Sequence, residues 1–455
     1  MFRGTSFLTG ISRMLRSSTY SKMFVVRHRL PSMCLRKVLG RNYRAESITY
    51  SELSDSQPYT IPCAWQGPDQ LAEFLYKRIV ATTEHFVVLD KPAGLSVWGH
   101  SLSKREALAF MQLEPDSSSS GLSVHQCLPQ LARLLHRNLP SSCSAPTTSE
   151  LSLSEGVSGS TTKLSIIEPL PAAYSGLIVL GRTPQFAQVA QTFYTNAQTS
   201  NPPWQLYQQF LAVCWNKPFR EHANNVRFPI ATYVVNEHVR VGYRPPPGEI
   251  TRKSERFGNV LHKYISHRSI TPTTGDASII ELRLNSTYRG LPEVYLLHEG
   301  CGIVGELFQS SRLVDTGLSP VVLPPAKIQF NRSHPLRIRR RLGVLDNRII
   351  PVHLHRTSVF LPTPVRVRPC STDCMQYRST VQSPVSFKKM SRTLSNNFDY
   401  SNLSWTKLSK WSDPESSNCL VLTCSCPSLP SYFAHTMQRL SVNFDYSSWL
   451  ASQKT

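Results

Sequence analysis

Residues 252–268 place cationic side chains beside aromatic rings within one short stretch of the chain. The cations and rings of this stretch are Arg252, Lys253, Arg256, Phe257, Lys263, Tyr264 and Arg268. Guanidinium and ammonium groups bind phosphates, and aromatic faces stack on splayed bases. The pattern therefore favours contact with an RNA backbone and unpaired bases. A solvated, charged face has the same composition, and this alternative stays open.

A second basic cluster lies between residues 332 and 348. Its members are Arg332, Arg337, Arg339, Arg340, Arg341 and Arg348. The whole chain of 455 residues has 50 Lys and Arg against 29 Asp and Glu, a net charge of +21. A surplus of this size indicates an anionic partner, with nucleic acid as the first candidate. The alternatives are a solvated turn at this cluster, or a basic scaffold that lacks salt-sensitive RNA binding.

A strand–loop–strand unit is predicted at residues 163–183, and the rest of the chain is arranged around it. An apolar run at 164–167 leads into a Pro-rich turn, and a second apolar run at 176–180 leads out. The pair Thr183-Pro184 then predicts a helix start, with a hydroxyl N-cap and proline at the first helical position.

Further helices and strands are predicted on both sides of this unit. Hydrophobic spacing predicts helices at 67–80 and 122–139, and strands at 85–91, 205–216, 277–288 and 352–356. Helices and strands that alternate in this way are compatible with a mixed sheet.

Two segments resemble motifs of the RluA-type pseudouridine synthases. Residues 90–95 (DKPAGL) are similar to the first family motif, and residues 174–177 (YSGL) are similar to the end of H-R-L-D-K-D-T-S-G-L. Aligned on these motifs, the catalytic aspartate of the family falls on Pro171. The arginine that pairs with it falls on Glu293, and the tyrosine that stacks on the target base falls on Phe210.

The resemblance implies isomerisation of uridine to pseudouridine in RNA, without a cofactor. The target nucleotide must leave its stack and meet a carboxylate that acts at the sugar as nucleophile or base. Pro171 has no titratable group, and Glu168 is a possible substitute three residues upstream. Even ~1 Å of displacement from the productive geometry costs ~100-fold in rate. Lys91, in the first motif, is a candidate phosphate contact, with a solvated lysine as the alternative.

The aspartate and the arginine are both replaced, and this is physically consistent. An arginine left buried without its carboxylate would cost several kcal/mol. Two functions follow from the resemblance. One is a pseudouridine synthase. The other is a catalytically inactive relative that binds RNA as a chaperone or as a mitochondrial ribosome assembly factor.

Within the family, the chain looks most like the mitochondrial messenger-RNA pseudouridine synthase branch. The shared features are a transit-like start, the altered aspartate motif, residues 353–356 (HLHR) and residues 430–433 (PSYF). The resemblance implies a mitochondrial matrix protein with mitochondrial mRNA or rRNA as partner. It also implies a mixed α/β (α+β-like) fold: a bent, largely antiparallel sheet with flanking helices and a central basic cleft.

Composition divides the chain into segments. Residues 1–45 are rich in Arg, Lys and Ser and contain no acidic residue, which is typical of a mitochondrial transit peptide; a basic RNA-binding arm is the alternative. A synthase-like domain is predicted at 67–360, interrupted by a disordered Ser/Thr/Gly-rich insertion at 140–162. A C-terminal extension, 365–455, contains a short repeat (387–401 and 433–447).

The sequence predicts no metal site and no membrane span. His353 and His355 share one face of a predicted strand, but no third ligand follows at a suitable spacing. The cysteines at 370–374 and 424–426 are irregularly spaced for zinc. No apolar run reaches the ~20 residues of a membrane helix. Eleven scattered cysteines favour reduced thiols.

Overall fold

A computed structural model describes thirteen stretches of the chain. They are residues 59, 65–98, 122–138, 163–199, 206–235, 238–244, 256–271, 277–315, 319–324, 334–344, 350–362, 402–408 and 419–453. The predicted transit peptide, the insertion at 140–162 and the first repeat copy at 387–401 lie outside these residues. In the described part of the chain, no helix is long and apolar enough to cross a membrane.

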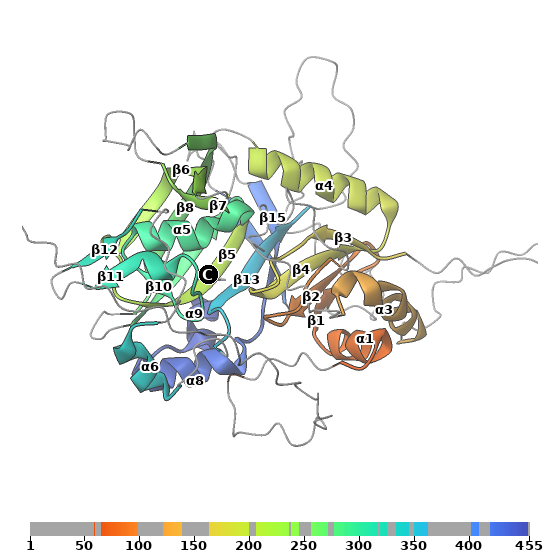
Figure 1. Ribbon diagram of the computed structural model, residues 1–455. Helices are drawn as coiled ribbons and strands as arrows, with labels where there is room; N and C mark the ends of the chain where they lie inside the picture. The colour runs from red at the N-terminus through yellow and green to blue at the C-terminus, as the bar shows by residue number, and fades with distance from the viewer. Residues whose placement is uncertain are drawn as a thin grey trace, which may run out of the picture. The chain divides into compact units, whose positions relative to one another are not determined.

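The described strands form one large, mostly antiparallel sheet (Figure 1). In spatial order its strands are β1 (Ile79–Thr82), β2 (Phe86–Lys91), β4 (Ser175–Gly181), β13 (Leu354–Leu361), β5 (Gln208–Trp215), β9 (Ala277–Leu284), β8 (Arg256–Ser269), β6 (His222–Val235) and β7 (His238–Tyr243). Branching from this path are β3 (Ser165–Glu168) on β4, β10 (Gly302–Ile303) on β5, β15 (Cys419–Ser425) on β13, and β14 (Leu403–Leu408) on β15. Strands β11 (Leu313–Asp315) and β12 (Pro320–Val322) pair separately. Only the β13–β4 pairing is parallel among the described strands.

Helices cover both faces of the sheet. They are α1 (Pro68–Tyr76), α3 (Val124–Asn138), α4 (Pro184–Thr199), α5 (Leu291–His298), α6 (Leu336–Leu342), α8 (Ser431–Arg439) and α9 (Tyr446–Ser452), with short 3-10 turns η2 (Tyr288–Gly290) and η3 (Ser310–Arg312). The predicted cap of α4 is confirmed, because Thr183 Oγ1 accepts a hydrogen bond from the Phe186 amide at 3.3 Å. The helix predicted at 67–80 ends earlier, at Tyr76, because the chain turns there into β1.

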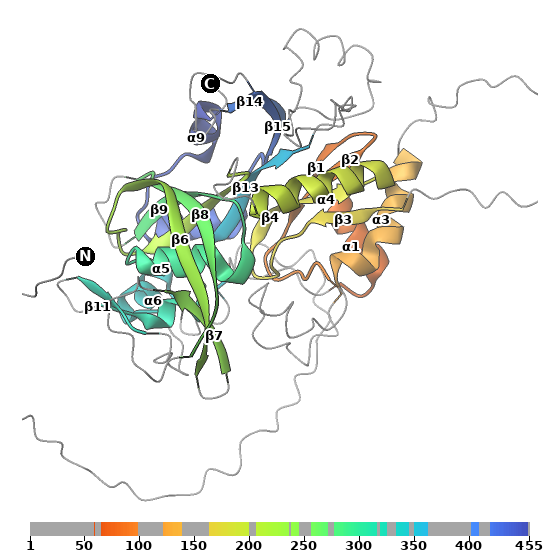
Figure 2. The ribbon, with the colours of Figure 1, turned by 90° about the horizontal axis from the view of Figure 1, so that it is seen from above.

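Alternate side chains of the central strands pack on opposite faces, as the period of a strand requires. In strands β2 and β4, Leu89 and Ile178 pack towards α1 and α3, whereas Val88 and Val179 pack towards α4. Helices α1 and α3 lie on one side of these strands and α4 on the other (Figure 1, Figure 2). Strand β5 repeats this division: Phe210 faces the cluster that contains α5, and its neighbours face the cluster of α6 and α8. Most helical stability here comes from these apolar faces.

The C-terminal region is part of the same sheet. Strand β15 pairs with β13 in register Ser358↔Ser425, and the amide of Cys426 donates to Thr357 O at 2.7 Å. Helix α8 packs into the same apolar cluster as α6. The described residues 419–453 of the predicted C-terminal extension therefore pack against the sheet and against α6, and the predicted domain boundary near residue 360 stays a prediction.

The observed fold is a mixed α/β arrangement with a large, mostly antiparallel sheet and flanking helices, which confirms the predicted fold class. The basic cleft that was expected along its middle stays a prediction.

Candidate functional site

The two motifs recognised in the sequence meet in space. Strands β2 and β4 pair antiparallel, with Lys91 opposite Gly176. The turn after β2 also contacts the Pro-rich loop directly, because the amide of Gly94 donates to Ala172 O at 2.8 Å. The loop at 169–174 is therefore held between the first motif and strand β4. This is the arrangement that the aligned motifs require.

Gly176 anchors this loop to strand β13. Its φ is +114°, a conformation that favours glycine. A Cβ atom at this position would lie 2.4 Å from Arg356 O and 2.5 Å from Arg356 N. Close approach of the two backbones thus explains why the second motif has glycine here.

Lys91 does not reach outward to a phosphate, which corrects the sequence prediction. The residue is fully buried. Its Nζ donates to three backbone carbonyl oxygens: Pro92 at 2.8 Å, Leu95 at 3.0 Å and Ala172 at 3.0 Å. The ammonium group therefore fixes the shape of the motif turn and the Pro-rich loop. The long stem and charge of a lysine usually indicate exposure, and nothing local in the sequence signalled this burial.

Glu293 and Phe210 lie next to the same loop, in the core. The hydroxyl of Tyr174 donates a hydrogen bond to Glu293 Oε1, and the ring of Tyr174 meets that of Phe210 edge-on, with centroids 6.3 Å apart. Phe210 is fully buried and Glu293 nearly so. Pro171 is buried in the loop as well. Tyr174 therefore joins Glu293 and Phe210 to the loop that contains Pro171, and none of the three motif positions presents a carboxylate to solvent.

Burial sets the protonation of Glu293. Removal from water raises the pKa of this carboxyl to about 7; the hydrogen bond from Tyr174 lowers it and the nearby charge of Glu306 raises it. In a family member this position carries a cation beside an aspartate. Here an acid occurs in a site where its neutral form is favoured.

Glu168, the possible substitute acid, is committed to a buried ion pair. Its Oε1 lies 3.3 Å from Arg356 Nη1 and accepts a hydrogen bond from the Tyr207 hydroxyl at 3.2 Å. Arg356 also donates to Gln208 Oε1 at 2.9 Å. Burial raises the pKa of Glu168, and the attraction of Arg356 opposes this rise. Both side chains are buried, so in this structure Glu168 is not exposed to a nucleotide.

Apart from Lys91, the predicted RNA-binding cations fall into three groups: those outside the described residues, those in β8 and those in α6. Arg252 and Lys253 lie outside the described residues, and Arg256 lies in β8. Lys263 is half-buried, and its Nζ donates to Gln198 O at 3.1 Å. The structure therefore does not bring the 252–268 cations together as one described surface.

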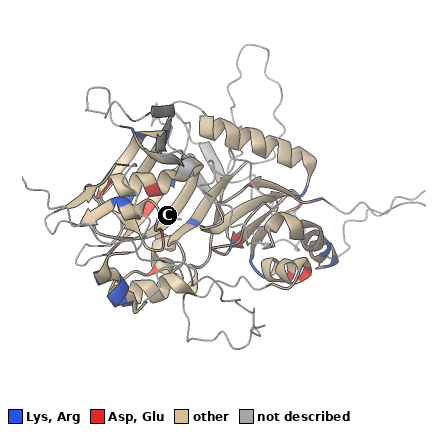
Figure 3. Ribbon diagram, viewed as in Figure 1, with Lys and Arg blue, Asp and Glu red and all other residues tan. Residues whose placement is uncertain are grey.

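The four arginines of α6 form the third group. Arg337 donates to Asn216 Oδ1, and Arg339 is half-buried. Arg340 and Arg341 are exposed. Figure 3 shows the cations of this helix gathered on one short element. A neighbour that sequence reasoning missed is Arg439, exposed at the end of α8, which packs against α6.

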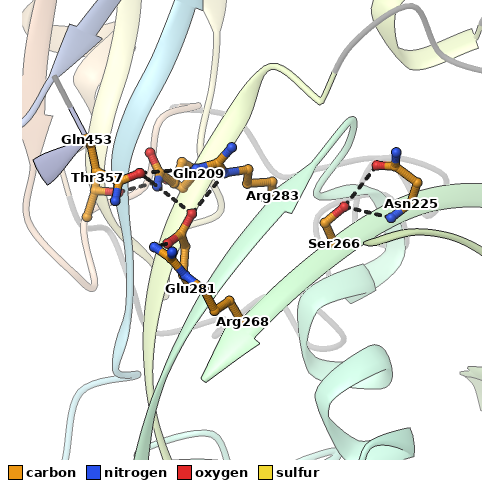
Figure 4. Close-up of polar contacts among 8 residues, drawn as sticks. All are labelled: Gln209, Asn225, Ser266, Arg268, Glu281, Arg283, Thr357 and Gln453. Atoms are coloured by element: carbon orange, nitrogen blue, oxygen red, sulfur yellow. Dashed lines mark hydrogen bonds and ion pairs between the residues drawn. The ribbon is translucent and has the colours of Figure 1, made fainter. Parts of the chain in front are cut away.

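A polar network around Glu281 was also missed. The Glu281 side chain is 4% exposed and pairs with Arg268 at 2.7 Å and with Arg283 at 2.8 Å. Gln209 donates to it as well at 2.8 Å, and Gln453 accepts from Arg283 at 3.1 Å (Figure 4). Glu281 lies in strand β9, and its partners Arg268 and Gln209 come from the neighbouring strands β8 and β5. Residue spacing along the chain therefore gives no sign of the network.

Comparison with known proteins supports the family indicated by the motifs. No protein-family model matches the chain. The chain is 24% identical over 299 residues to Mitochondrial mRNA pseudouridine synthase RPUSD3 of Homo sapiens, covering 65% of this chain and 71% of that protein. This likeness agrees with the resemblance to RluA-type pseudouridine synthases that the two motifs indicate.

Two solved human structures are also similar. Human RNA Pseudouridylate Synthase Domain Containing 4 aligns with a TM-score of 0.47 and 18% identity, over 83% of this chain and 98% of that one. Human RNA Pseudouridylate Synthase Domain Containing 1 aligns with a TM-score of 0.35 and 11% identity, over 69% and 94%.

Proposed function

We propose that this chain is an RNA-binding protein of mitochondria that keeps the framework of an RluA-type pseudouridine synthase without its isomerase chemistry. Its role would be that of an RNA chaperone or a mitochondrial ribosome assembly factor. One observation carries the proposal: where the motifs meet, the hydroxyl of Tyr174 is hydrogen-bonded to Glu293 inside the core. The isomerisation needs a carboxylate that reaches the sugar of a flipped nucleotide.

The alternative acids at this point do not meet that need. Glu293 is buried and favours its neutral form, and Glu168 is paired with Arg356. Pro171 replaces the family aspartate with a side chain that neither ionises nor accepts a proton. Because rate falls steeply with small displacements of a catalytic group, a distant carboxylate is a poor replacement.

The exposed arginines of two packed helices support RNA binding. Helices α6 and α8 share an apolar cluster that includes Ile338 and Met437. Arg340, Arg341 and Arg439 are exposed on these helices, and we call them the α6–α8 basic surface. Cations on a rigid pair of helices suit the repeated phosphates of an RNA strand. The net charge of +21 adds a long-range attraction to any such partner.

The mitochondrial assignment is part of the proposal. It is supported by the relative, which is named as a mitochondrial protein that acts on mRNA. It is also supported by the basic, acid-free composition of residues 1–45. The proposed compartment is the matrix, and the proposed partners are mitochondrial mRNA or rRNA.

Active pseudouridine synthesis is the second candidate. The observation that favours it is the name of the relative, a pseudouridine synthase. In that case the acid would come from Glu168 or from Glu293, after a rearrangement that exposes it.

Two measurements on the purified full chain separate these functions. The first is RNA affinity as a function of salt, for wild type and for an Arg340→Gln/Arg341→Gln/Arg439→Gln variant. Each lost phosphate contact on a single strand reduces the steepness of the plot of log K against log salt by about 0.7. The slope measured for the triple variant should therefore be shallower than that of wild type by about 2. The matched control replaces Lys77, Arg133 and Arg137, exposed cations of the α1–α3 region, with Gln.

The second measurement is pseudouridine formed in mitochondrial RNA transcripts after long incubation with excess protein. The proposal expects tight, salt-sensitive binding and no pseudouridine above the level without protein. Site-specific pseudouridine that Glu168→Gln or Glu293→Gln abolishes would establish the second candidate. If the salt dependence of RNA affinity weakens equally in the Arg340/Arg341/Arg439 variant and in the Lys77/Arg133/Arg137 control, the α6–α8 basic surface is excluded as the RNA contact.

A further inference from the structure

Three side chains that can bind a metal ion meet beside the two motifs, where His355 contacts Ser175 of the second motif. Asp90 lies in strand β2, His355 lies in β13, and Cys426 follows β15. One ligand atom from each residue lies within 4.8 Å of the other two. Because these residues are far apart in the sequence, no local spacing could have revealed the cluster.

Two side chains of this cluster each have a buried polar atom without a hydrogen-bond partner. Neither Asp90 Oδ1 nor His355 Nε2 has one among the described residues, although both atoms are buried. His355 is fully buried. An unsatisfied buried polar atom destabilises the fold, so two of them in one cluster call for an explanation. A metal ion between them would satisfy both.

The opposite edges of these side chains are already held. His355 Nδ1 lies 3.0 Å from Ser175 Oγ, and that hydroxyl lies 3.0 Å from the hydroxyl of Tyr432. The other oxygen of Asp90 pairs with Arg78. Metal-binding imidazoles and carboxylates are usually oriented by such partners on the side away from the ion.

We propose that Asp90, His355 and Cys426 bind a Zn²⁺ ion. A thiolate with an imidazole and a carboxylate is a donor set suited to zinc, whereas Mg²⁺ and Ca²⁺ prefer oxygen ligands alone. Zinc bonds of about 2.0–2.3 Å place tetrahedral donors about 3.3–3.8 Å apart. Side-chain movements of about 1 Å would therefore close the present cluster on the ion. The fourth position would be open to water or to another ligand.

Zinc binding would require the Cys426 thiol to lose its proton to solvent. The two positive charges of the ion and that of Arg78 would then face the negative charges of Asp90 and the thiolate, a net charge of +1. In the metal-free arrangement the Cys426 thiol donates to Ser428 O at 3.2 Å, a weak bond that is given up. Arg78 stays paired with the second oxygen of Asp90.

The site would join the C-terminal segment to the sheet. Cys426 is the only one of the three ligands that comes from the region after β13. An ion shared by β2, β13 and this segment would hold the segment against the strand that leads into the first motif. The proposed site is independent of whether the chain forms pseudouridine.

The test uses the reduced full chain. Wild-type protein is loaded with zinc, passed through gel filtration and analysed for bound metal. Cys426→Ser and His355→Gln should weaken zinc binding by at least 100-fold, since loss of a mere supporting residue already costs about 10–100-fold. The matched controls Cys424→Ser and His353→Gln remove a buried thiol and a buried imidazole outside the cluster and should retain zinc. A chelator should lower the Tm of wild type and controls but not that of Cys426→Ser.

Cobalt provides a readout that needs no variant to fold. Co²⁺ added to wild type should give a thiolate-to-cobalt charge-transfer absorption, which zinc then displaces. The proposal is overturned if folded, reduced wild type shows no such band. It is also overturned if wild type retains no more zinc than Cys426→Ser, or if a folded Cys424→Ser chain loses as much zinc as Cys426→Ser.

Discussion

Replacing Glu293 with Gln should make the folded protein more stable at alkaline pH than wild type. The amide oxygen of Gln can still accept the hydrogen bond from Tyr174, while the ionisable group is removed. In wild type, burial raises the pKa of Glu293 from 4.5 to about 7. The folded state therefore binds this proton more tightly than the unfolded chain does.

The sign of the pH dependence follows from this difference. The stability contribution of the neutral carboxyl is fully present below about 4.5 and is lost as pH rises through about 7, the folded-state pKa. Each tenfold change in the acid constant corresponds to about 1.4 kcal/mol, so the total loss is about 3 kcal/mol. Gln does not titrate, so the free energy of unfolding of the variant relative to wild type should rise by this amount between pH 4.5 and pH 8.

Urea denaturation followed by tryptophan fluorescence at a series of pH values measures this difference. The control is Glu73→Gln, because Glu73 is exposed on α1 and its substitution should leave the pH profile of wild type unchanged. A stability difference between Glu293→Gln and wild type that is the same at pH 5 and pH 8 would refute the reasoning. It would mean that Glu293 ionises in the folded chain as easily as in the unfolded one.

Three further substitutions test the packing around the motifs. Gly176→Ala should cost roughly 2–5 kcal/mol, because its new Cβ meets the Arg356 backbone at a positive φ; an unchanged urea midpoint would contradict this. Glu168→Leu should cost about 3–5 kcal/mol by leaving Arg356 unpaired, and adding Arg356→Met should recover most of the loss; a double variant as unstable as the single one would argue against the pair. Lys91→Met should cost at least about 2 kcal/mol, since three carbonyl oxygens lose their donor, whereas Met at the exposed Lys77 should be neutral in the same thermal melts.

Local patterns in the sequence predicted the elements well. The cap at Thr183, the helix across Pro129, and the buried strands β2 and β4 follow from residue types within a few positions. The end of α1 was missed, because β1 is fixed by pairing with β2 and not by its own sequence.

Side-chain partners were harder to predict than elements. Glu168 and Arg356 pair across different strands, so neither spacing nor composition joined them. Lys91 was taken for a surface cation because lysine is rarely buried, and its three carbonyl partners exist only in the folded turn. The motif alignment assigned Glu293 to the position of the family arginine, and in the structure Glu293 accepts a hydrogen bond from Tyr174 at the end of the Pro-rich loop.

The most direct test of the central claim is a pseudouridine map of mitochondrial RNA after depletion of this protein. Depleted cells are rescued with wild type, with Glu168→Ala, or with the Arg340→Gln/Arg341→Gln/Arg439→Gln variant. The account predicts that every pseudouridine site persists on depletion while RNA levels or ribosome assembly fall. It also predicts that the Glu168→Ala chain, if it folds, restores them and the charge-removal variant does not. Loss of specific sites that only wild type restores would contradict the account and show that the chain is an active synthase.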